Sequence, residues 1–180
     1  GSQYPNIVQI AYQFVVYDKS ESRLRGGAKY DFIIKPDNYE IPFEATLIHG
    51  ITNKYATENG VGIENVISQL NRQIKEKQPT LIVHNAEFDI TILKHFGLYE
   101  YVSYFCTMKY CSDIRINGSD KFLKLTELYS FLFKKEIHQQ HDALKDMELL
   151  SDCFIELFNR KIVDEYIVKN ESNKISFNSF

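Results

Sequence analysis

The stretch LIVHNAEFDITILKHFG at residues 81–97 decides the fold. Its first three residues are apolar and predict a short buried strand. The following apolar side chains recur at helical spacing and predict an amphipathic helix: Phe88, Ile92, Leu93 and Phe96. Gly97 then provides a natural helix end. Asp89 therefore lies at a strand-to-helix junction, where an aspartate is either a helix cap or a site residue at the carboxyl end of the strand.

The segments before this stretch predict a hairpin and a helix. Residues 7–17 and 29–34 are apolar, β-branched and aromatic, and the polar, glycine-containing stretch between them indicates a longish hairpin loop. Prolines punctuate a loop that leads to residues 48–52. Apolar side chains from Ile63 to Ile74 then repeat at helical spacing and predict a helix that stops near Pro79.

The segments after it predict two further helices, over 123–133 and over 142–158. Strands alternating with helices after an initial hairpin indicate an α/β fold with a mixed sheet flanked by helices. The polar residues beyond Arg160 are expected to form a loosely held tail.

Composition limits the function classes. A chain of 180 residues with 44% hydrophobic content suits one α/β domain, and no apolar run approaches the roughly 18 residues of a membrane span. We expect an intracellular, cytoplasmic protein without membrane association. Three cysteines without a CxxC pair favour reduced, packed thiols, with Cys106 and Cys111 as packing residues. The formal charge of −3 argues against coating long nucleic acid, but not against gripping one strand end.

A second cluster, HDALKD at residues 141–146, also pairs a histidine with an aspartate. Five residues correspond to about 140° around a helix, so His141 and Asp146 cannot share one face, and His141 must precede the helix or lie in its first turn. Hard cations such as Mg²⁺ prefer carboxylate oxygens, and a neutral histidine can take a proton from water. Asp89, Asp146 and His141 could therefore act together, although His141 could equally be a surface histidine in a polar loop.

The roles of His84 and of four lysines remain open, and so does the source of further metal ligands. His84 is expected to close the turn after the strand. The lysines Lys121, Lys124, Lys134 and Lys135 either border a phosphate path or form a solvated face. Two aspartates are also too few to hold a pair of metal ions about 4 Å apart.

Four segments, in this order, resemble the DnaQ-like, DEDDh-type exonuclease family: IVQIAY at 7–12, IHGIT at 48–52, VHNAEFD at 83–89 with CTM at 106–108, and HDALKD at 141–146. The resemblance implies a ribonuclease-H-like fold, with an exonuclease domain over 1–160 and a tail over 161–180. It implies that Asp89 and Asp146 are metal ligands for two Mg²⁺ or Mn²⁺ ions and that His141 is the general base.

The same resemblance implies an activity and partners. Members of the family, which includes the proofreading subunit of bacterial DNA polymerase III (epsilon), remove nucleotides one at a time from 3′ ends. We expect a single-stranded or frayed nucleic-acid 3′ end as substrate, DNA rather than RNA, and a DNA polymerase as a partner. His49, Ile51 and Thr52 are candidate contacts for the terminal nucleotide, and Phe88 is expected to pack in the core.

The sequence departs from the family at its first motif. Members carry Asp-x-Glu on a central first strand ahead of the segment matched here by IVQIAY, and residues 1–6, GSQYPN, contain no such element. Without that strand the sheet would be left as two half-sheets with exposed edges. Asp18 and Glu21 lie beyond the following strand and are not substitutes. We expect residues ahead of Gly1 in the natural protein, or another chain, to supply the strand.

Two functions are therefore in competition. The first is a metal-dependent 3′-to-5′ exonuclease that releases nucleoside monophosphates in proofreading or DNA repair. The second is a catalytically inactive module with the exonuclease fold, which binds nucleic-acid ends or a polymerase partner. Divalent-metal binding separates them, because only the first requires it.

Overall fold

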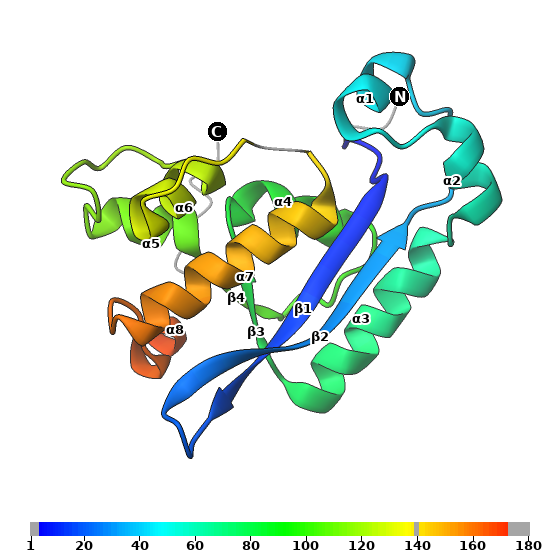
Figure 1. Ribbon diagram of the computed structural model, residues 1–180. Helices are drawn as coiled ribbons and strands as arrows, with labels where there is room; N and C mark the ends of the chain where they lie inside the picture. Colours follow the sequence, from blue (N-terminus) through cyan, green and yellow to red (C-terminus); the bar gives the residue numbers. More distant parts are fainter. Residues whose placement is uncertain (1–3, 139–140, 173–180) are drawn as a thin grey trace, which may run out of the picture.

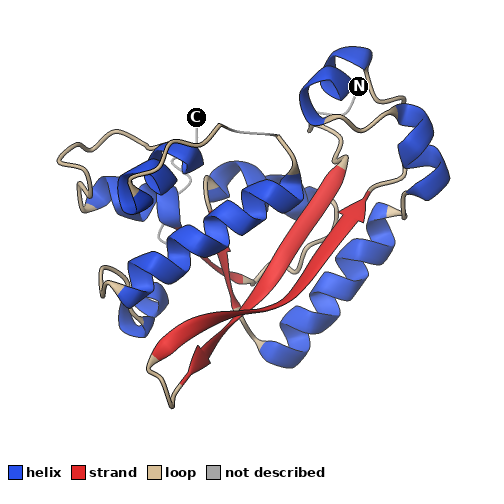
Figure 2. Ribbon diagram, viewed as in Figure 1, coloured by secondary structure: helices blue, strands red, loops and turns tan. Residues whose placement is uncertain are grey.

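The computed structural model describes residues 4–138 and 141–172 (Figure 1). Two small sheets lie among helices, as the colouring by secondary structure shows (Figure 2). In chain order the elements are β1 (Gln9–Asp18), β2 (Arg23–Ile33), α1 (Phe43–His49), α2 (Asn53–Asn59), α3 (Ile63–Lys77), β3 (Thr80–Val83), α4 (Ala86–His95), β4 (Ser103–Cys106), α5 (Thr107–Asp113), α6 (Leu125–Phe133), α7 (Ala143–Asn159) and α8 (Glu165–Glu171).

The hairpin predicted near the amino terminus is present. Strands β1 and β2 pair antiparallel from Gln9 opposite Ile33 to Asp18 opposite Arg23, with an irregularity between Gln13 and Val15. Both strands extend further than the apolar runs, so the connecting turn is shorter than expected. Polar residues join these strand ends because the half-exposed hairpin places few demands on their burial.

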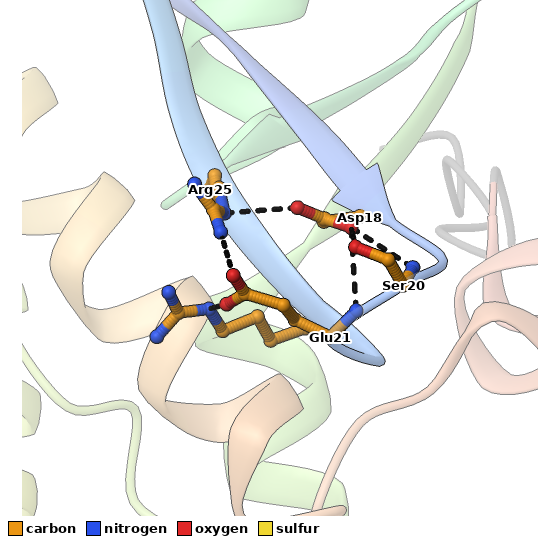
Figure 3. A network of polar contacts seen from close by, with 5 residues as sticks. Asp18, Ser20, Glu21 and Arg25 are labelled. Carbon is orange, nitrogen blue, oxygen red and sulfur yellow. Dashed lines mark hydrogen bonds and ion pairs between the residues drawn. The ribbon is translucent and has the colours of Figure 1, made fainter.

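Charged side chains hold this turn (Figure 3). The Asp18 carboxylate accepts hydrogen bonds from the Ser20 hydroxyl and backbone N–H and lies 3.1 Å from Arg25 Nε. The Ser20 hydroxyl bond is the main reason why the pKa of Asp18 lies below its usual range. Arg25 also pairs with Glu21. Asp18 and Glu21 thus form their contacts within the turn, at the carboxyl end of β1, whereas Gln9 begins that strand.

Helices cover both faces of the hairpin. Side chains alternate along β1, so its even-numbered and odd-numbered residues face opposite ways. On one face, Ile10 packs with residues of α3, and the Tyr12 hydroxyl donates to Gln73 Oε1 at 2.7 Å. On the other face, the α7 helix begins against Gln9 and ends against Tyr17, whose ring lies 5.8 Å from that of Phe158.

The second sheet has the same three-layer arrangement. Strands β3 and β4 are parallel, with Thr80 opposite Ser103 and Val83 opposite Cys106, and α4 lies within their crossover connection. Tyr104 and Cys106 are buried in a cluster with α3 and α4, whereas Phe105 is buried among residues of α6 and α7. The expected strand at 81–83 is confirmed as part of β3, but its residues are half-buried rather than buried.

The two sheets remain separate. The described residues form one sheet with the order β1-β2 and a second with the order β3-β4, and neither sheet hydrogen-bonds to the other. The expectation of two half-sheets is confirmed. A mixed α/β fold with helices on both faces is also confirmed.

Two regions differ from the prediction. The region before residue 62 was expected to be a loop, but it contains the short helices α1 and α2. Neither helix was predicted, because each has only seven residues and at most one buried side chain, so the apolar spacing is weak. The expectation of a loosely held tail is wrong for residues 161–172, because Val163 is fully buried in the core and α8 follows it. Residues 173–180 of the predicted tail lie outside the described residues. Within the described residues, no helix is long and apolar enough to cross a membrane.

Candidate active site

Asp89 lies on the first turns of α4, close behind strand β3. The strand ends at Val83, and Asn85 takes a left-handed conformation with φ of 74°, which asparagine tolerates better than most residues. Asn85 occupies the cap position, so Asp89 is the fourth helical residue and not a cap. Burial raises the pKa of Asp89 to about 6. A carboxyl group desolvated in this way gains from a cation or a proton beside it.

His84 fixes the end of β3 to two other segments, as expected of a turn-closing residue. Its Nε2 lies 2.8 Å from the Leu123 carbonyl oxygen, to which it donates, and its Nδ1 lies 2.9 Å from the Thr107 hydroxyl. Burial lowers the pKa of His84, which favours the neutral ring. The contacts therefore join β3, α5 and the segment before α6.

Asp146 lies one turn inside α7. Asp142 caps this helix by accepting from the Lys145 N–H, and the Ala143 N–H donates to Gln9 Oε1 at 3.0 Å. The first turn of α7 is thereby fixed beside the first residue of β1. The predicted placement of His141 ahead of the helix is confirmed: it is exposed, with a left-handed φ of 52°.

One cavity of about 1390 Å³ joins the two aspartates. Its walls include β1, β3, the inner face of α7 and residues of α3 and α4, so it fills the gap between the two sheets. Asp89 and Asp146 both line it, although they are 57 positions apart in the sequence (146 minus 89). His141 precedes the helix that carries Asp146 but is not among the lining residues.

The described residues do not complete a metal site. Two carboxylates on one cavity supply the oxygen ligands that Mg²⁺ prefers. However, no group of three or more histidine, cysteine or acidic side chains in residues 4–138 and 141–172 is placed to hold a metal ion. Asp89 and Asp146 can therefore provide part of a coordination shell, and further ligands are required for two metal ions.

The segment around residues 49–52 does not join this cavity. His49 ends α1, and its Nδ1 accepts from the Ile51 N–H at 3.1 Å. Ile51 is buried in a small cluster, and the Thr52 hydroxyl caps α2 by accepting from the Tyr55 N–H. None of His49, Ile51 and Thr52 lines the cavity with Asp89. Their contacts shape the connection between α1 and α2, and their role toward a nucleotide stays a prediction.

Two aromatic lining residues, Phe88 and Phe122, were not identified as site residues from the sequence, whereas Lys124 was among the lysines left open between a phosphate path and a solvated face. Phe88 was expected in the core, but its side chain is 56% exposed and lines the cavity, so that expectation is wrong. Phe122 is 57% exposed and lines the same cavity, as does Lys124. For Phe122, an aromatic residue between lysines was the available signal, and only the fold shows that it lines the same cavity as Asp89. Cys106 and Cys111 are buried, as expected of packing residues.

Comparison with known proteins identifies the family of the chain. The chain belongs to the exonuclease family RNase_T, whose family model matches residues 2–154. It is 28% identical over 158 residues to the DNA polymerase III subunit epsilon of Rickettsia conorii. The matched region covers 80% of this chain and 66% of that protein. It is 28% identical over 138 residues to the same subunit of Rickettsia prowazekii, covering 73% and 58%. The chain thus spans less than two thirds of these two relatives.

Solved structures share the fold. The cell-death related nuclease CRN-4 superposes with a TM-score of 0.65 at 13% identity, over 86% of this chain and 57% of that one. The nuclease domain of 3′hExo, a DEDDh family member solved with rAMP, superposes with a TM-score of 0.60 at 12% identity, over 88% and 94%. The chain therefore has the ribonuclease-H-like fold of the DnaQ-like exonucleases.

Proposed function

We propose that the protein is a metal-dependent 3′-to-5′ exonuclease whose active site includes Asp89, Asp146 and His141. One observation carries this proposal: the aspartates of two distant family motifs line a single cavity in a chain of the exonuclease family. The substrate is the 3′ end of a nucleic-acid strand, with DNA favoured by the relatives that are DNA polymerase III epsilon subunits. By the same relatives, a DNA polymerase is the proposed partner.

Each residue has a distinct proposed role. Asp89 and Asp146 are ligands for Mg²⁺ or Mn²⁺, and the pKa of Asp89, raised to about 6 by burial, gives its carboxylate a reason to bind a cation. Two such ions, when bound, would neutralise phosphate charge. His141 is exposed ahead of α7, from where its imidazole can take the proton of an attacking water.

The remaining ligands are proposed to come from an additional strand between β1 and β3. The Ile34 N–H donates to the Val8 carbonyl, so the register of the hairpin makes Val8, Ile10 and Tyr12 the hydrogen-bonded positions. Ala11 and Gln13 then turn their backbone polar groups away from β2, and both line the cavity. Strand β3 pairs only with β4 among the described residues, so it too leaves one edge unpaired.

The direction of this additional strand follows from the ends of its neighbours. Gln9 at the start of β1 contacts the start of α7, and Asp89 follows the end of β3. The amino end of β1 and the carboxyl end of β3 therefore lie toward the aspartates. A strand antiparallel to β1 and parallel to β3 would bring its carboxyl end to Asp89 and Asp146, where an Asp-x-Glu motif would complete the ligand set.

Amide hydrogen exchange tests the strand. In protein that contains the additional strand, the N–H groups of Ala11 and Gln13 should exchange as slowly as that of Ile10, since all three would be hydrogen-bonded within a sheet. In protein without that strand, Ala11 and Gln13 should exchange faster than Ile10. Equal protection of all three in both proteins would show that these groups are paired without an added strand.

An oligonucleotide assay tests the activity. Natural-length protein with Mg²⁺ or Mn²⁺ should shorten a 5′-labelled single strand in one-nucleotide steps, and a chelator should stop it. Asp146→Ala should abolish turnover with the fold intact, and His141→Ala should lower the rate by roughly 100- to 10,000-fold. The matched control is Glu148→Ala, because Glu148 lies on the same helix but pairs with Lys29 and does not line the cavity. Unchanged turnover in Asp146→Ala would refute the assignment.

The alternative is a non-catalytic module that binds strand ends, and the incomplete metal cluster among the described residues favours it. Under this alternative, natural-length protein binds a 3′ end but no divalent metal and releases no nucleotide. Stepwise shortening that requires a metal excludes it.

A further inference from the structure

The segment Lys121–Lys124, here named the KFLK loop, combines exposed functional side chains with a firmly held backbone. It connects α5 with α6. Phe122 and Lys124 are exposed. Leu123 between them is 7% exposed and packs in the main core cluster, which includes Phe105, Leu128 and Leu157. Leu123 thus anchors the loop in the core, while Phe122 and Lys124 on either side of it are exposed.

Hydrogen bonds fix the loop on both sides of Phe122. The buried His84 ring donates to the Leu123 carbonyl at 2.8 Å, which ties the loop to the end of β3. The Lys124 N–H donates to Glu127 at 2.7 Å, and the Ser112 hydroxyl donates to the Asp120 carbonyl. An exposed phenyl ring on such a backbone is presented in a defined place, and little ordering entropy is lost when a ligand contacts it.

The loop faces the cavity that holds the aspartates. Phe122 and Lys124 line this cavity together with Asp89 and with Phe88 of α4. Phe122 and Phe88 are each more than half exposed, although burying such a side chain would stabilise the chain by about 1.5–3 kcal/mol. The exposed Phe122 ring therefore offers a surface on which the planar face of a ligand can stack.

Lys124 has no evident structural reason to be a lysine. It occupies the cap position of α6, where serine, threonine, aspartate and asparagine are preferred and where the helix dipole disfavours a cation. Lys121 lies 3.8 Å from Glu127, but Lys124 forms no ion pair within residues 4–138 and 141–172. An unneutralised ammonium at this position is suited to an anionic ligand.

We propose that the KFLK loop binds single-stranded nucleic acid at the carboxyl end of β3, beyond the end of the additional strand proposed above, with a base stacked on Phe122 and a backbone phosphate paired with Lys124. Proteins that bind single strands without sequence preference combine these two elements, an aromatic platform and a cation beside it. The proposal rests on the exonuclease function proposed above, since that function supplies the strand. It adds a site for the nucleotides that precede the terminal one.

Binding of a labelled oligonucleotide tests the loop separately from catalysis. The probe is a fluorescein-labelled twelve-residue oligothymidylate, and its anisotropy is measured with natural-length protein in a chelator, so that it is not cut. Phe122→Ala should weaken binding roughly 5- to 100-fold, as expected for one lost stacking contact, and Phe122→Tyr should retain affinity. Lys124→Ala should weaken binding and lower the slope of log affinity against log salt concentration by about 0.7, and Lys124→Arg should retain that slope.

Matched controls use the same residue types elsewhere. Tyr101 is an 81% exposed aromatic residue and Lys54 an exposed lysine on α2, and neither lines the cavity. Tyr101→Ala and Lys54→Ala should bind the probe like the unchanged protein. Unchanged affinity in both Phe122→Ala and Lys124→Ala, or equal losses in the controls, would overturn the proposal.

The outcomes also separate this proposal from the catalytic one. If Phe122 and Lys124 are required for binding but no strand is shortened with Mg²⁺ or Mn²⁺, the exonuclease proposal fails and the loop assignment stands. If strands are shortened with kcat/KM unchanged in both loop variants, the loop assignment fails alone. If the unchanged protein does not bind the probe at all, the loop assignment is overturned.

Discussion

Asp89→Asn should stabilise the protein at neutral pH in the absence of metal. Burial raises the pKa of Asp89 from 3.8 to about 6, so the folded protein holds this proton more tightly than the unfolded chain does. The stability that protonated Asp89 contributes is fully present below pH 4 and is lost as the pH rises through 6. Above pH 7 the folded protein contains a desolvated, ionised carboxylate, to which the described residues form no ion pair.

The magnitude follows from the same pKa values. Each pKa unit corresponds to about 1.4 kcal/mol, so the rise of Asp89 from 3.8 to about 6 corresponds to a loss of up to about 3 kcal/mol above pH 7. Asparagine has nearly the same shape and no charge. For a chain of this size, 1 kcal/mol shifts Tm by about 2–4 °C. The change in Tm caused by Asp89→Asn should therefore be up to roughly 6–12 °C more favourable at pH 8 than at pH 4.

The assay is thermal unfolding in a chelator from pH 4 to pH 9. The control is Glu87→Gln, which removes an exposed carboxylate from the first turn of the same helix and should change Tm by little at any pH. Asp89→Asn should at the same time lose exonuclease activity, since it lacks the proposed ligand. A Tm difference between Asp89→Asn and the unchanged protein that does not vary with pH would refute the reasoning.

Three further predictions concern the core and the end of one helix. Leu157→Ala should cost about 2–5 kcal/mol in the free energy of unfolding, measured with urea, because Leu157 is fully buried in the main core cluster. Burial raises the pKa of Cys111 and Cys153 to about 12, so both thiols should react with a disulfide reagent at pH 8 only when the protein unfolds; fast labelling of the folded protein would contradict this. Gly60→Ala should destabilise by about 1–3 kcal/mol in thermal unfolding, because the added Cβ would clash with the Ala56 carbonyl oxygen.

Local patterns predicted the elements that carry the aspartates. The apolar run at 81–83 and the spacing that follows it placed Asp89 at a strand-to-helix junction, and the structure agrees, although the strand is half-buried. The angular argument that separated His141 from Asp146 also holds, since Asp142 caps α7 and leaves His141 ahead of it. These predictions succeeded because strand length, helical spacing and capping are local properties of the chain.

Exposure near the cavity could not be predicted in the same way. Phe88 has the spacing of a core residue, yet the face of α4 on which it lies meets the open gap between the sheets. Likewise, Lys124 has the appearance of one solvated lysine among several, and only the contact between His84 and Leu123 brings its loop to the end of β3. Both outcomes depend on long-range packing.

Calorimetric titration of Mn²⁺ into natural-length protein tests the central claim most directly, because the claim assigns Asp89 and Asp146 to a metal site that other carboxylates complete. The account predicts two Mn²⁺ ions per chain in the unchanged protein and in Glu148→Ala. It predicts weakened or lost binding in Asp89→Asn and in Asp146→Asn. Absence of Mn²⁺ binding in the unchanged, folded protein, or unaltered binding in both aspartate variants, would contradict it.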